Sequence, residues 1–251
     1  MPINILSSSD LALKPDGLAR KHKGMLGISI TNHAFSKQVV QDIVRLGLST
    51  CSEFVVILVD YPDRWNWPLR AVDAAGNIEW CLRVGREREA GYARALRNLD
   101  LPHSVETWHW EKIASTPIYE RNLNLVKSQF QQNSRFRNLI REQVLSNLGG
   151  RIAEAEQKHG FIITTDKIDI MAHYLMEEIA GLWYLQFDLG YSLDFYPGRQ
   201  MLVMTCIYEN AFPEFAKQLN YDWSAQGFIE VGYPPPTSAA ISYPSSKSRI
   251  S

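Results

Sequence analysis

Short apolar runs lie at intervals along the chain, and their apolarity is continuous rather than alternating. Such runs are typical of strands in a parallel sheet that is covered on both faces. The predicted strands cover residues 25–30, 54–59, 78–84, 105–110 and 200–208. The pattern therefore predicts a mostly parallel sheet flanked by helices.

Three other segments have apolar residues at helical spacing. Residues 36–46 lie between the first two predicted strands, which is the order of a βαβ unit. Residues 121–148 predict a long amphipathic helix, with a break near Asn133 and Ser134. Residues 166–187 predict another helix, with Asp166 as its N-cap. Strands and helices in this order predict an α/β fold with a Rossmann-like, doubly wound sheet.

The composition indicates one globular domain over residues 24–231. With 45% hydrophobic and 21% charged residues, the chain of 251 residues is neither disordered nor fibrous. Residues 1–23 are polar and predict a flexible leader, and residues 232–251 are rich in proline and serine and predict a disordered tail. The sequence shows neither a signal peptide nor a membrane-spanning run, so a cytoplasmic protein with no membrane partner is expected.

The cysteines and histidines predict no metal site. Three widely spaced cysteines form neither a disulfide framework nor a zinc motif, which favours a reducing compartment. The six histidines show no metal-ligand spacing.

The formal net charge of −1 conceals two halves of opposite sign. The first 151 residues carry 20 Lys and Arg against 15 Asp and Glu, whereas residues 152–230 carry 4 against 12. Four arginines of the basic half are candidates for binding an RNA phosphate backbone: Arg86, Arg88, Arg94 and Arg97. If residues 86–96 form a helix, Arg86, Arg94 and Arg97 lie on one face of it. Gly85 argues against a helix that begins earlier in the sequence. A solvated face balanced by nearby acids is the alternative.

Ser29 is the first candidate for chemistry. It lies at the end of the first predicted strand and Asn32 lies in the following turn, at the edge where ligands bind in a doubly wound sheet. Its hydroxyl is either a nucleophile or an ordinary turn serine. The segment is not a nucleophile elbow, because that motif requires glycine where Thr31 stands. The glycine spacing also excludes a dinucleotide-binding or Walker loop.

The second candidate is a tyrosine–glutamate pair. Tyr174 and Glu178 are four residues apart and share one face of a predicted helix that is otherwise apolar. Apolar surroundings would raise the pKa of Glu178 and suit it to proton transfer with an amine or alcohol. The alternative is an exposed glutamate at the helix rim, and Glu177 is expected to face solvent. Tyr196, before Pro197, is either presented rigidly by a turn or purely structural.

Taken in order, these segments resemble the tRNA-dependent cyclodipeptide synthases. The resemblance extends from about residue 24 to 215 and is carried by Gly27-x-Ser29-x-x-Asn32, the arginine-rich segment, Tyr119, Tyr174-x-x-x-Glu178 and Tyr196-Pro197. That family is similar in fold to the catalytic domains of class I aminoacyl-tRNA synthetases. The His-Ile-Gly-His and Lys-Met-Ser-Lys-Ser motifs that bind ATP in those enzymes are missing from this sequence. The resemblance therefore implies two aminoacyl-tRNAs as substrates, with no cofactor and no DNA.

The resemblance also implies roles for single residues in a ping-pong reaction. Ser29 would carry an aminoacyl group and then a dipeptidyl group, whose free amine closes a diketopiperazine ring. Tyr174 and Glu178 would bind the first amino group, with Glu178 as proton acceptor. Asn32 and Tyr196 would orient the ester. Gly27 and Tyr119 match other positions of the substrate pocket, and enzymes that modify the product would be downstream partners.

One feature departs from the family pattern. Members tend to combine asparagine at the position of Asn32 with histidine after the later tyrosine, where this chain has Pro197. A proton relay through that histidine is therefore missing, which fits a divergent branch such as the fungal arginine-using synthases. A buried guanidinium needs a carboxylate, and Asp194 would share a face with Tyr196 if that segment is extended.

Two alternatives belong to other functional classes. The first is a serine acyltransferase or hydrolase that acts on a non-tRNA ester, although no Ser/His/Asp arrangement in a usual order is found. The second is a non-catalytic tRNA-binding module.

Overall fold

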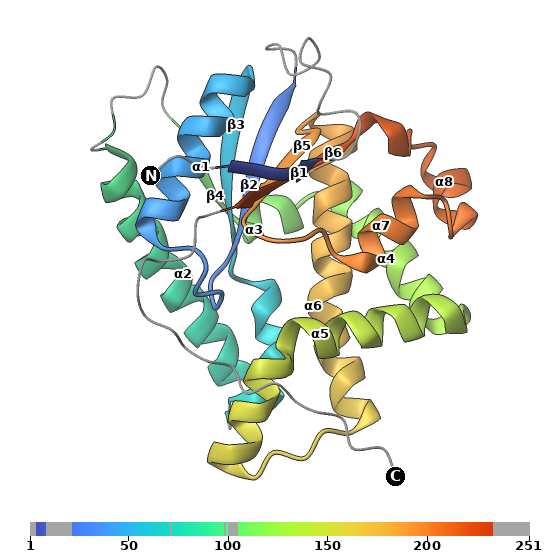
Figure 1. Cartoon of the computed structure of the whole chain (residues 1–251). Coiled ribbons are helices and arrows are strands. Elements are labelled where there is room, and N and C mark those ends of the chain that lie inside the picture. The colour runs from blue at the N-terminus through green and yellow to red at the C-terminus, as the bar shows by residue number, and fades with distance from the viewer. Residues whose placement is uncertain (1–3, 9–21, 71, 98, 100–104, 233–251) are drawn as a thin grey trace, which may run out of the picture.

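A six-stranded sheet runs through the part of the chain that the structure, a computed structural model, describes: residues 4–8, 22–70, 72–97, 99 and 105–232 (Figure 1). The strands are β1 (Asn4–Ser8), β2 (Lys23–Ser29), β3 (Glu53–Val59), β4 (Glu106–His109), β5 (Leu193–Tyr196) and β6 (Gly227–Gly232). Their order is β1-β6-β5-β2-β3-β4, and only the edge pair β1–β6 is antiparallel. The predicted mostly parallel sheet is confirmed.

Helices cover both faces of this sheet and extend beyond it. They are α1 (Lys37–Thr50), α2 (Ala74–Arg97), α3 (Trp110–Ala114), α4 (Pro117–Gln132), α5 (Ser134–His159), α6 (Thr165–Trp183), α7 (Leu202–Tyr208) and α8 (Pro213–Leu219). Three shorter helical segments are η1 (Pro62–Leu69), η2 (Tyr184–Asp188) and η3 (Trp223–Ala225). In Figure 1 the strands β2 and β3 end on the side of the sheet where η1 and α5 lie. The fold thus leaves the carboxyl ends of the strands next to a group of helices.

The side chains of β2 divide between two cores. Leu26 and Ile28 pack with Ile43 of α1, on the face covered by α1 and α2. Met25 faces the other side and packs in a cluster with Trp110 of α3 and with residues of α6. Because side chains alternate along a strand, the last residue of β2 also points to the α6 side.

Two of the predicted strands are wrong. Residues 78–84 belong to α2, in which Asn77, Cys81 and Gly85 are buried at a spacing of four residues. Asp73 accepts a hydrogen bond from the backbone of Gly76 at the start of this helix. Gly85 lies inside the helix. The close packing accounts for a glycine at this position, because a Cβ atom there would stand 2.5 Å from the carboxylate of Asp60. Its presence therefore marks a close approach of α2 to the sheet, not a helix start.

Residues 200–208 are also not a strand. Most of them form α7, with Val203, Met204 and Ile207 buried on one helical face. The strands next to β2 on this side of the sheet are β5 and then β6, which precede and follow this helix in the sequence. Predicted strands 25–30, 54–59 and 105–110 are confirmed as β2, β3 and β4.

The predicted helices are confirmed, with one corrected cap. The break in the second helix lies at Asn133, whose side chain accepts from the backbone of Phe136 and caps α5. Thr164, not Asp166, caps α6 by accepting from the backbone of Lys167. The α-helical geometry of α6 ends at Trp183, and the π-helical turn η2 continues it.

Strand β1 lies inside the segment predicted as a leader and pairs with β6. Of the predicted tail, all residues after Gly232 lie outside the described part of the chain. None of the helices in the described residues combines the length and the apolar composition that a membrane-spanning helix requires.

Candidate active site

A cavity of about 1580 Å³ opens at the carboxyl ends of β2 and β5, with walls from η1, α2, α5, α6 and α7. Its lining includes most of the residues predicted from the sequence. These are Gly27, Ser29, Asn32, Tyr174, Glu178, Asp194, Tyr196 and Arg88. The fold thus brings together residues that are up to 169 positions apart in the chain.

Ser29 forms part of the cavity wall at the end of β2. Among the described residues, its Oγ atom has one side-chain hydrogen-bond partner, Thr31 Oγ1 at 3.4 Å. Gly27 lies two residues earlier on the same face of the strand. A Cβ atom at Gly27 would contact only Val59 within 4 Å and would project into the cavity. The absence of a side chain at Gly27 therefore keeps open the space beside the serine.

Asn32 joins the turn after β2 to the end of β5. Its backbone N–H donates to the carbonyl of Ser29 at 3.1 Å, and its Oδ1 accepts from the backbone of Ala34. Its Nδ2 donates to the hydroxyl of Tyr196 at 3.2 Å. Burial, reinforced by the charge of Glu178, raises the pKa of Tyr196 to about 12. Tyr196 is therefore a neutral phenol whose proton is free to donate into the cavity.

Tyr174 and Glu178 lie on the face of α6 that forms another cavity wall. The hydroxyl of Tyr174 accepts from Asn147 of α5 at 2.8 Å, which leaves its own proton available. Within the described part of the chain, the Glu178 carboxyl has neither a hydrogen bond nor an ion pair. Burial, followed by the charges of Asp63 and Asp194, raises its pKa to about 8. A group with this pKa exchanges protons near neutral pH.

A second carboxyl without a described hydrogen-bond partner faces the same cavity. Asp194 and Tyr196 both line it from β5, as predicted for an extended segment. Burial raises the pKa of Asp194 to about 7. Because buried charges require a counter-charge, a cavity with two unpaired carboxyls is suited to a ligand that carries positive groups.

Glu177 corrects the expectation of a solvent-facing residue. Its side chain is only 3% exposed and receives both terminal nitrogens of Arg64, one of them at 2.7 Å. Trp65 donates to the same carboxylate at 2.8 Å. Arg64 also lies 3.7 Å over the ring of Tyr61. The partners come from η1, a segment to which the hydrophobic pattern assigned no structure.

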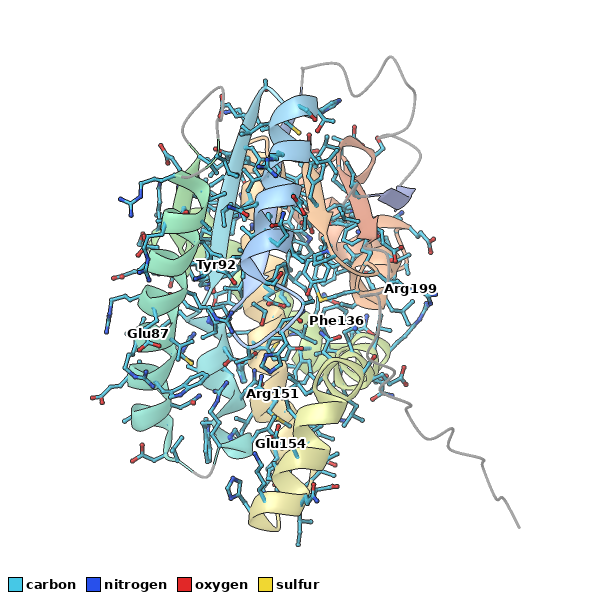
Figure 2. The ribbon with its side chains drawn as sticks, turned by 60° about the vertical axis from the view of Figure 1, so that its left-hand side comes forward. Glu87, Tyr92, Phe136, Arg151, Glu154 and Arg199 are labelled. Atoms are coloured by element: carbon cyan, nitrogen blue, oxygen red, sulfur yellow. The ribbon has the colours of Figure 1, made fainter. Side chains whose placement is uncertain are left out.

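Other predicted residues lie apart from the serine. Tyr119 is not part of the cavity lining and is buried beside Trp110, whose indole N–H lies 3.5 Å from its hydroxyl. Arg86, Arg94 and Arg97 are exposed along α2. Figure 2 shows the side of α2 that bears Tyr92 turned to α1, whereas Glu87 is on the outer side. The residues predicted to bind tRNA therefore divide between the cavity wall, with Arg88, and the outer surface of α2.

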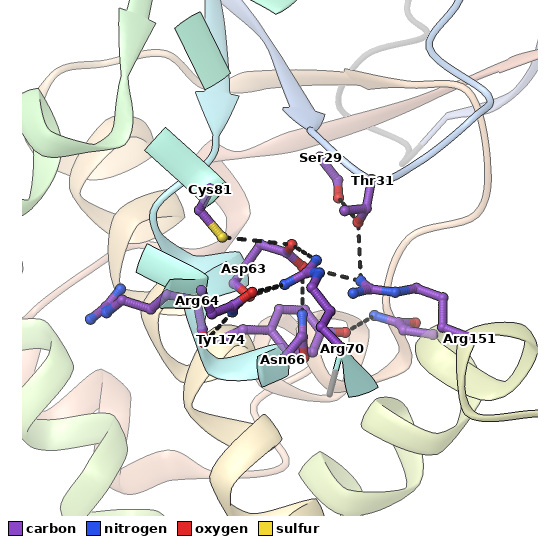
Figure 3. A network of polar contacts seen from close by, with 11 residues as sticks. Ser29, Thr31, Asp63, Arg64, Asn66, Arg70, Cys81, Arg151 and Tyr174 are labelled. Atoms are coloured by element: carbon purple, nitrogen blue, oxygen red, sulfur yellow. Dashed lines mark hydrogen bonds and ion pairs between the residues drawn. The ribbon is translucent and has the colours of Figure 1, made fainter. Parts of the chain in front are cut away.

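The hydrophobic pattern missed a polar network beside Ser29 (Figure 3). The network centres on Asp63 of η1, with Arg70, Arg151 and Asn66 as partners. Arg151 also donates to Thr31 at 3.1 Å. No sequence motif marks these residues, since Arg151 is 88 positions from Asp63 and 120 from Thr31.

Comparison with known proteins gives structural likeness without close sequence likeness. No family model matches the chain, and no curated protein matches it. A cyclodipeptide synthase from Fluoribacter dumoffii aligns with a TM-score of 0.70 and 16% identity, over 92% of this chain and 97% of that protein. One from Candidatus Glomeribacter gigasporarum, bound to Phe-tRNAPhe, has a TM-score of 0.68 and 20% identity, over 97% of this chain and 100% of that protein.

The likeness extends to an aminoacyl-tRNA synthetase. A tyrosyl-tRNA synthetase from Archaeoglobus fulgidus, complexed with L-tyrosine, has a TM-score of 0.54 and 12% identity. It aligns over 85% of this chain and 55% of its own length. The predicted Rossmann-like fold of class I synthetases is thereby confirmed. The chain has the fold of the cyclodipeptide synthases.

Proposed function

We propose that the protein is a cyclodipeptide synthase that joins the amino acids of two aminoacyl-tRNAs into a 2,5-diketopiperazine. The observation that carries this proposal is the cavity in which Ser29 lies with Tyr174 and the unpaired carboxyl of Glu178. The fold supports it, because the structural neighbours include cyclodipeptide synthases, one of them bound to Phe-tRNAPhe.

The first step transfers an aminoacyl group to the enzyme. Ser29 Oγ attacks the carbonyl carbon of the tRNA ester, and the bond from that carbon to the ribose oxygen breaks. The serine proton ends on the ribose oxygen of the released tRNA. Asn32 and Tyr196, which are hydrogen-bonded to each other, supply polar groups that orient the ester. The ester is already activated, so the step needs no nucleotide.

The second step builds the dipeptide on the enzyme. The ammonium of the aminoacyl group on Ser29 is held by Tyr174 and Glu178, and Glu178 accepts its proton. The free amine then attacks the carbonyl carbon of the second aminoacyl-tRNA ester, and the bond from that carbon to the ribose oxygen breaks. A proton of the amine ends on the ribose oxygen of the released tRNA, and a dipeptide stays on Ser29. In the last step the neutral terminal amine attacks the carbonyl carbon of the serine ester, the bond from that carbon to Ser29 Oγ breaks, and a proton of this amine ends on the serine oxygen as the ring closes.

One substrate in this proposal is arginyl-tRNA. A guanidinium entering the cavity would need a carboxylate partner, and Asp194 has no described hydrogen-bond partner of its own. Substitution Asp194→Asn should shift the product mixture away from arginine-containing cyclic dipeptides, measured by mass spectrometry of the culture medium. Unchanged arginine content in the Asp194→Asn products would contradict this assignment.

The exposed arginines of α2 are proposed to bind the tRNA backbone. Replacing Arg86, Arg94 and Arg97 together by glutamine should weaken tRNA binding. The decrease of log affinity with log salt should become shallower, its slope changing by about 2 to 3 toward zero. Fluorescence anisotropy with labelled tRNA at several salt concentrations measures this slope. An unchanged slope would identify the arginines as an ordinary solvated surface.

The proposed reaction is tested by expression in a host followed by mass spectrometry of the medium. The wild-type chain should add a cyclic dipeptide, and Ser29→Ala should abolish it while tRNA binding remains. Ser49→Ala, which removes a hydroxyl from exposed positions of α1, is the matched control and should keep full product. A serine hydrolase would instead cleave a simple activated ester without tRNA. A binding module would bind tRNA and form no product.

A further inference from the structure

We propose that Arg151 is a positioning residue for the reaction at Ser29, acting through the hydroxyl of Thr31. Figure 3 shows these three side chains in a row, with Arg151 reaching from α5 to the end of β2. The inference rests on the proposed function, in which Ser29 is the nucleophile.

The row is defined by two contacts. Arg151 Nη1 donates to Thr31 Oγ1 at 3.1 Å, and Thr31 Oγ1 lies 3.4 Å from Ser29 Oγ. A guanidinium has no acceptor, so the oxygen of Thr31 must be the acceptor in the first contact. This contact favours an orientation in which the Thr31 proton points to Ser29. Thr31 then contacts the reacting oxygen directly, and Arg151 acts one bond further away.

Asp63 holds Arg151 in place without cancelling its charge. The same Nη1 atom of Arg151 donates to Asp63 Oδ1 at 3.1 Å, and Asn66 donates to this oxygen at 2.6 Å. The other carboxylate oxygen is bonded to Arg70. Two guanidiniums therefore share one buried carboxylate, and the group of three keeps one net positive charge.

Besides Asp63, Arg70 contacts residues of α2. It donates to Asn77 of α2 at 2.7 Å, and its guanidinium lies 4.0 Å from the ring centroid of Trp80. The guanidinium with a contact toward the serine is thus that of Arg151. Its side chain is 25% exposed, which means that its field at Ser29 is only partly screened.

The arrangement answers a problem of the chemistry. Among the described residues, the one side-chain hydrogen-bond partner of Ser29 Oγ is the hydroxyl of Thr31, which is not a base. Negative charge develops on Ser29 Oγ when it attacks the first ester and again when it leaves in ring closure. A donor and a fixed positive charge that are already in place stabilise this charge in both steps.

Four variants test the inference by the rate at which Ser29 becomes acylated in a single turnover with radiolabelled aminoacyl-tRNA. Thr31→Val and Arg151→Gln should each lower the maximal rate at saturating tRNA about 100-fold, with little change in the tRNA concentration at half-maximal rate. Thr31→Ser and Arg151→Lys should recover most of the rate, because hydroxyl and charge remain. Arg45→Gln, an exposed arginine of α1 with its own aspartate, is the control and should not change it.

The double variant Thr31→Val with Arg151→Gln separates a shared path from two independent effects. A shared path gives a double variant hardly slower than either single one. Additive losses, or an Arg151→Gln variant impaired only in tRNA affinity, would overturn the inference. Thermal unfolding identifies variants that fail to fold. If Thr31→Val or Arg151→Gln fails to fold, the acylation rates of Thr31→Ser and Arg151→Lys are used for the test. If Ser29→Ala itself keeps product formation, the proposed function fails instead.

Discussion

Two adjacent glutamates of α6 lie in opposite environments. Glu177 points to η1, where Arg64 and Trp65 donate three hydrogen bonds to its two oxygens. Glu178, rotated by about 100° around the helix, points into the cavity and has no hydrogen bond within the described part of the chain. Both are glutamates of one largely buried helix, so the difference between them comes from what faces each side.

The difference separates a carboxylate that stabilises the fold from one that is proposed to take part in the reaction. Buried acids are stable as anions only where donors or cations replace the lost water, and η1 supplies these to Glu177. Glu178 lacks them, and its raised pKa leaves it able to take up and release a proton. A substrate ammonium would supply the missing counter-charge. The packing of α6 against η1 thus fixes the helix that presents Glu178.

The largest expected effect is on catalysis at Glu178. Glu178→Gln keeps the shape of the side chain and removes the proton acceptor, so product formation should fall about 10²- to 10⁴-fold. The free energy of unfolding should not decrease, because no described hydrogen bond is lost. Mass spectrometry of the product and denaturant unfolding measure the two quantities. Glu156→Gln, an exposed glutamate of α5, is the control, and a Glu178 variant with normal activity would contradict its proposed role.

At Glu177 the expected effect is on stability. Glu177→Ala leaves the mostly buried guanidinium of Arg64 unpaired, and breaking such a pair costs about 3–5 kcal/mol. Denaturant unfolding should show this loss, while the activity per folded molecule changes much less than in Glu178→Gln. The double variant Arg64→Met with Glu177→Leu removes both charges and should recover most of the stability. A stable Glu177→Ala variant would show that the contrast between the two glutamates is wrong.

Local sequence rules predicted the positions of the groups proposed to react better than their surroundings. The continuous apolar run of β2 placed Ser29 near the end of a strand, and helical periodicity placed Tyr174 and Glu178 on one helix face. Periodicity gave the rotation of Glu177 away from Glu178 but not the presence of Arg64 on that side. Short apolar runs are equally compatible with a buried helix, which is why residues 78–84 and 200–208 were assigned wrongly.

The network around Asp63 shows where such rules end. Asp63 lies in the short 3-10 segment η1 and Arg70 directly follows it, and Arg151 is one of many arginines in the basic half of the chain. Their meeting depends on how η1 and α5 pack below the sheet. Contacts over 88 and 120 positions are set by the tertiary fold and leave no local pattern.

The smallest expected effect concerns stability against pH and uses the same two glutamates. The folded-state pKa of Glu178 is raised from the ordinary 4.5 to about 8, so between these values the unfolded chain releases a proton that the folded protein keeps. The free energy of unfolding should therefore fall as pH rises through this range. The fall should be on the order of 2 kcal/mol, less than the full pKa difference corresponds to, because solvent in the cavity reduces the cost of the charged carboxylate. Asp194, with a pKa raised to about 7, acts in the same direction.

Glu178→Gln should make the curve of unfolding free energy against pH flatter than that of the wild type, with the two proteins differing most above pH 8. Denaturant unfolding at half-unit steps from pH 5 to pH 9 measures both curves. Asp194→Asn should flatten the curve separately, and Glu156→Gln should leave its slope as it is in the wild type. Parallel curves for wild type and Glu178→Gln would mean that Glu178 finds a counter-charge in the folded protein, and the contrast with Glu177 would then disappear.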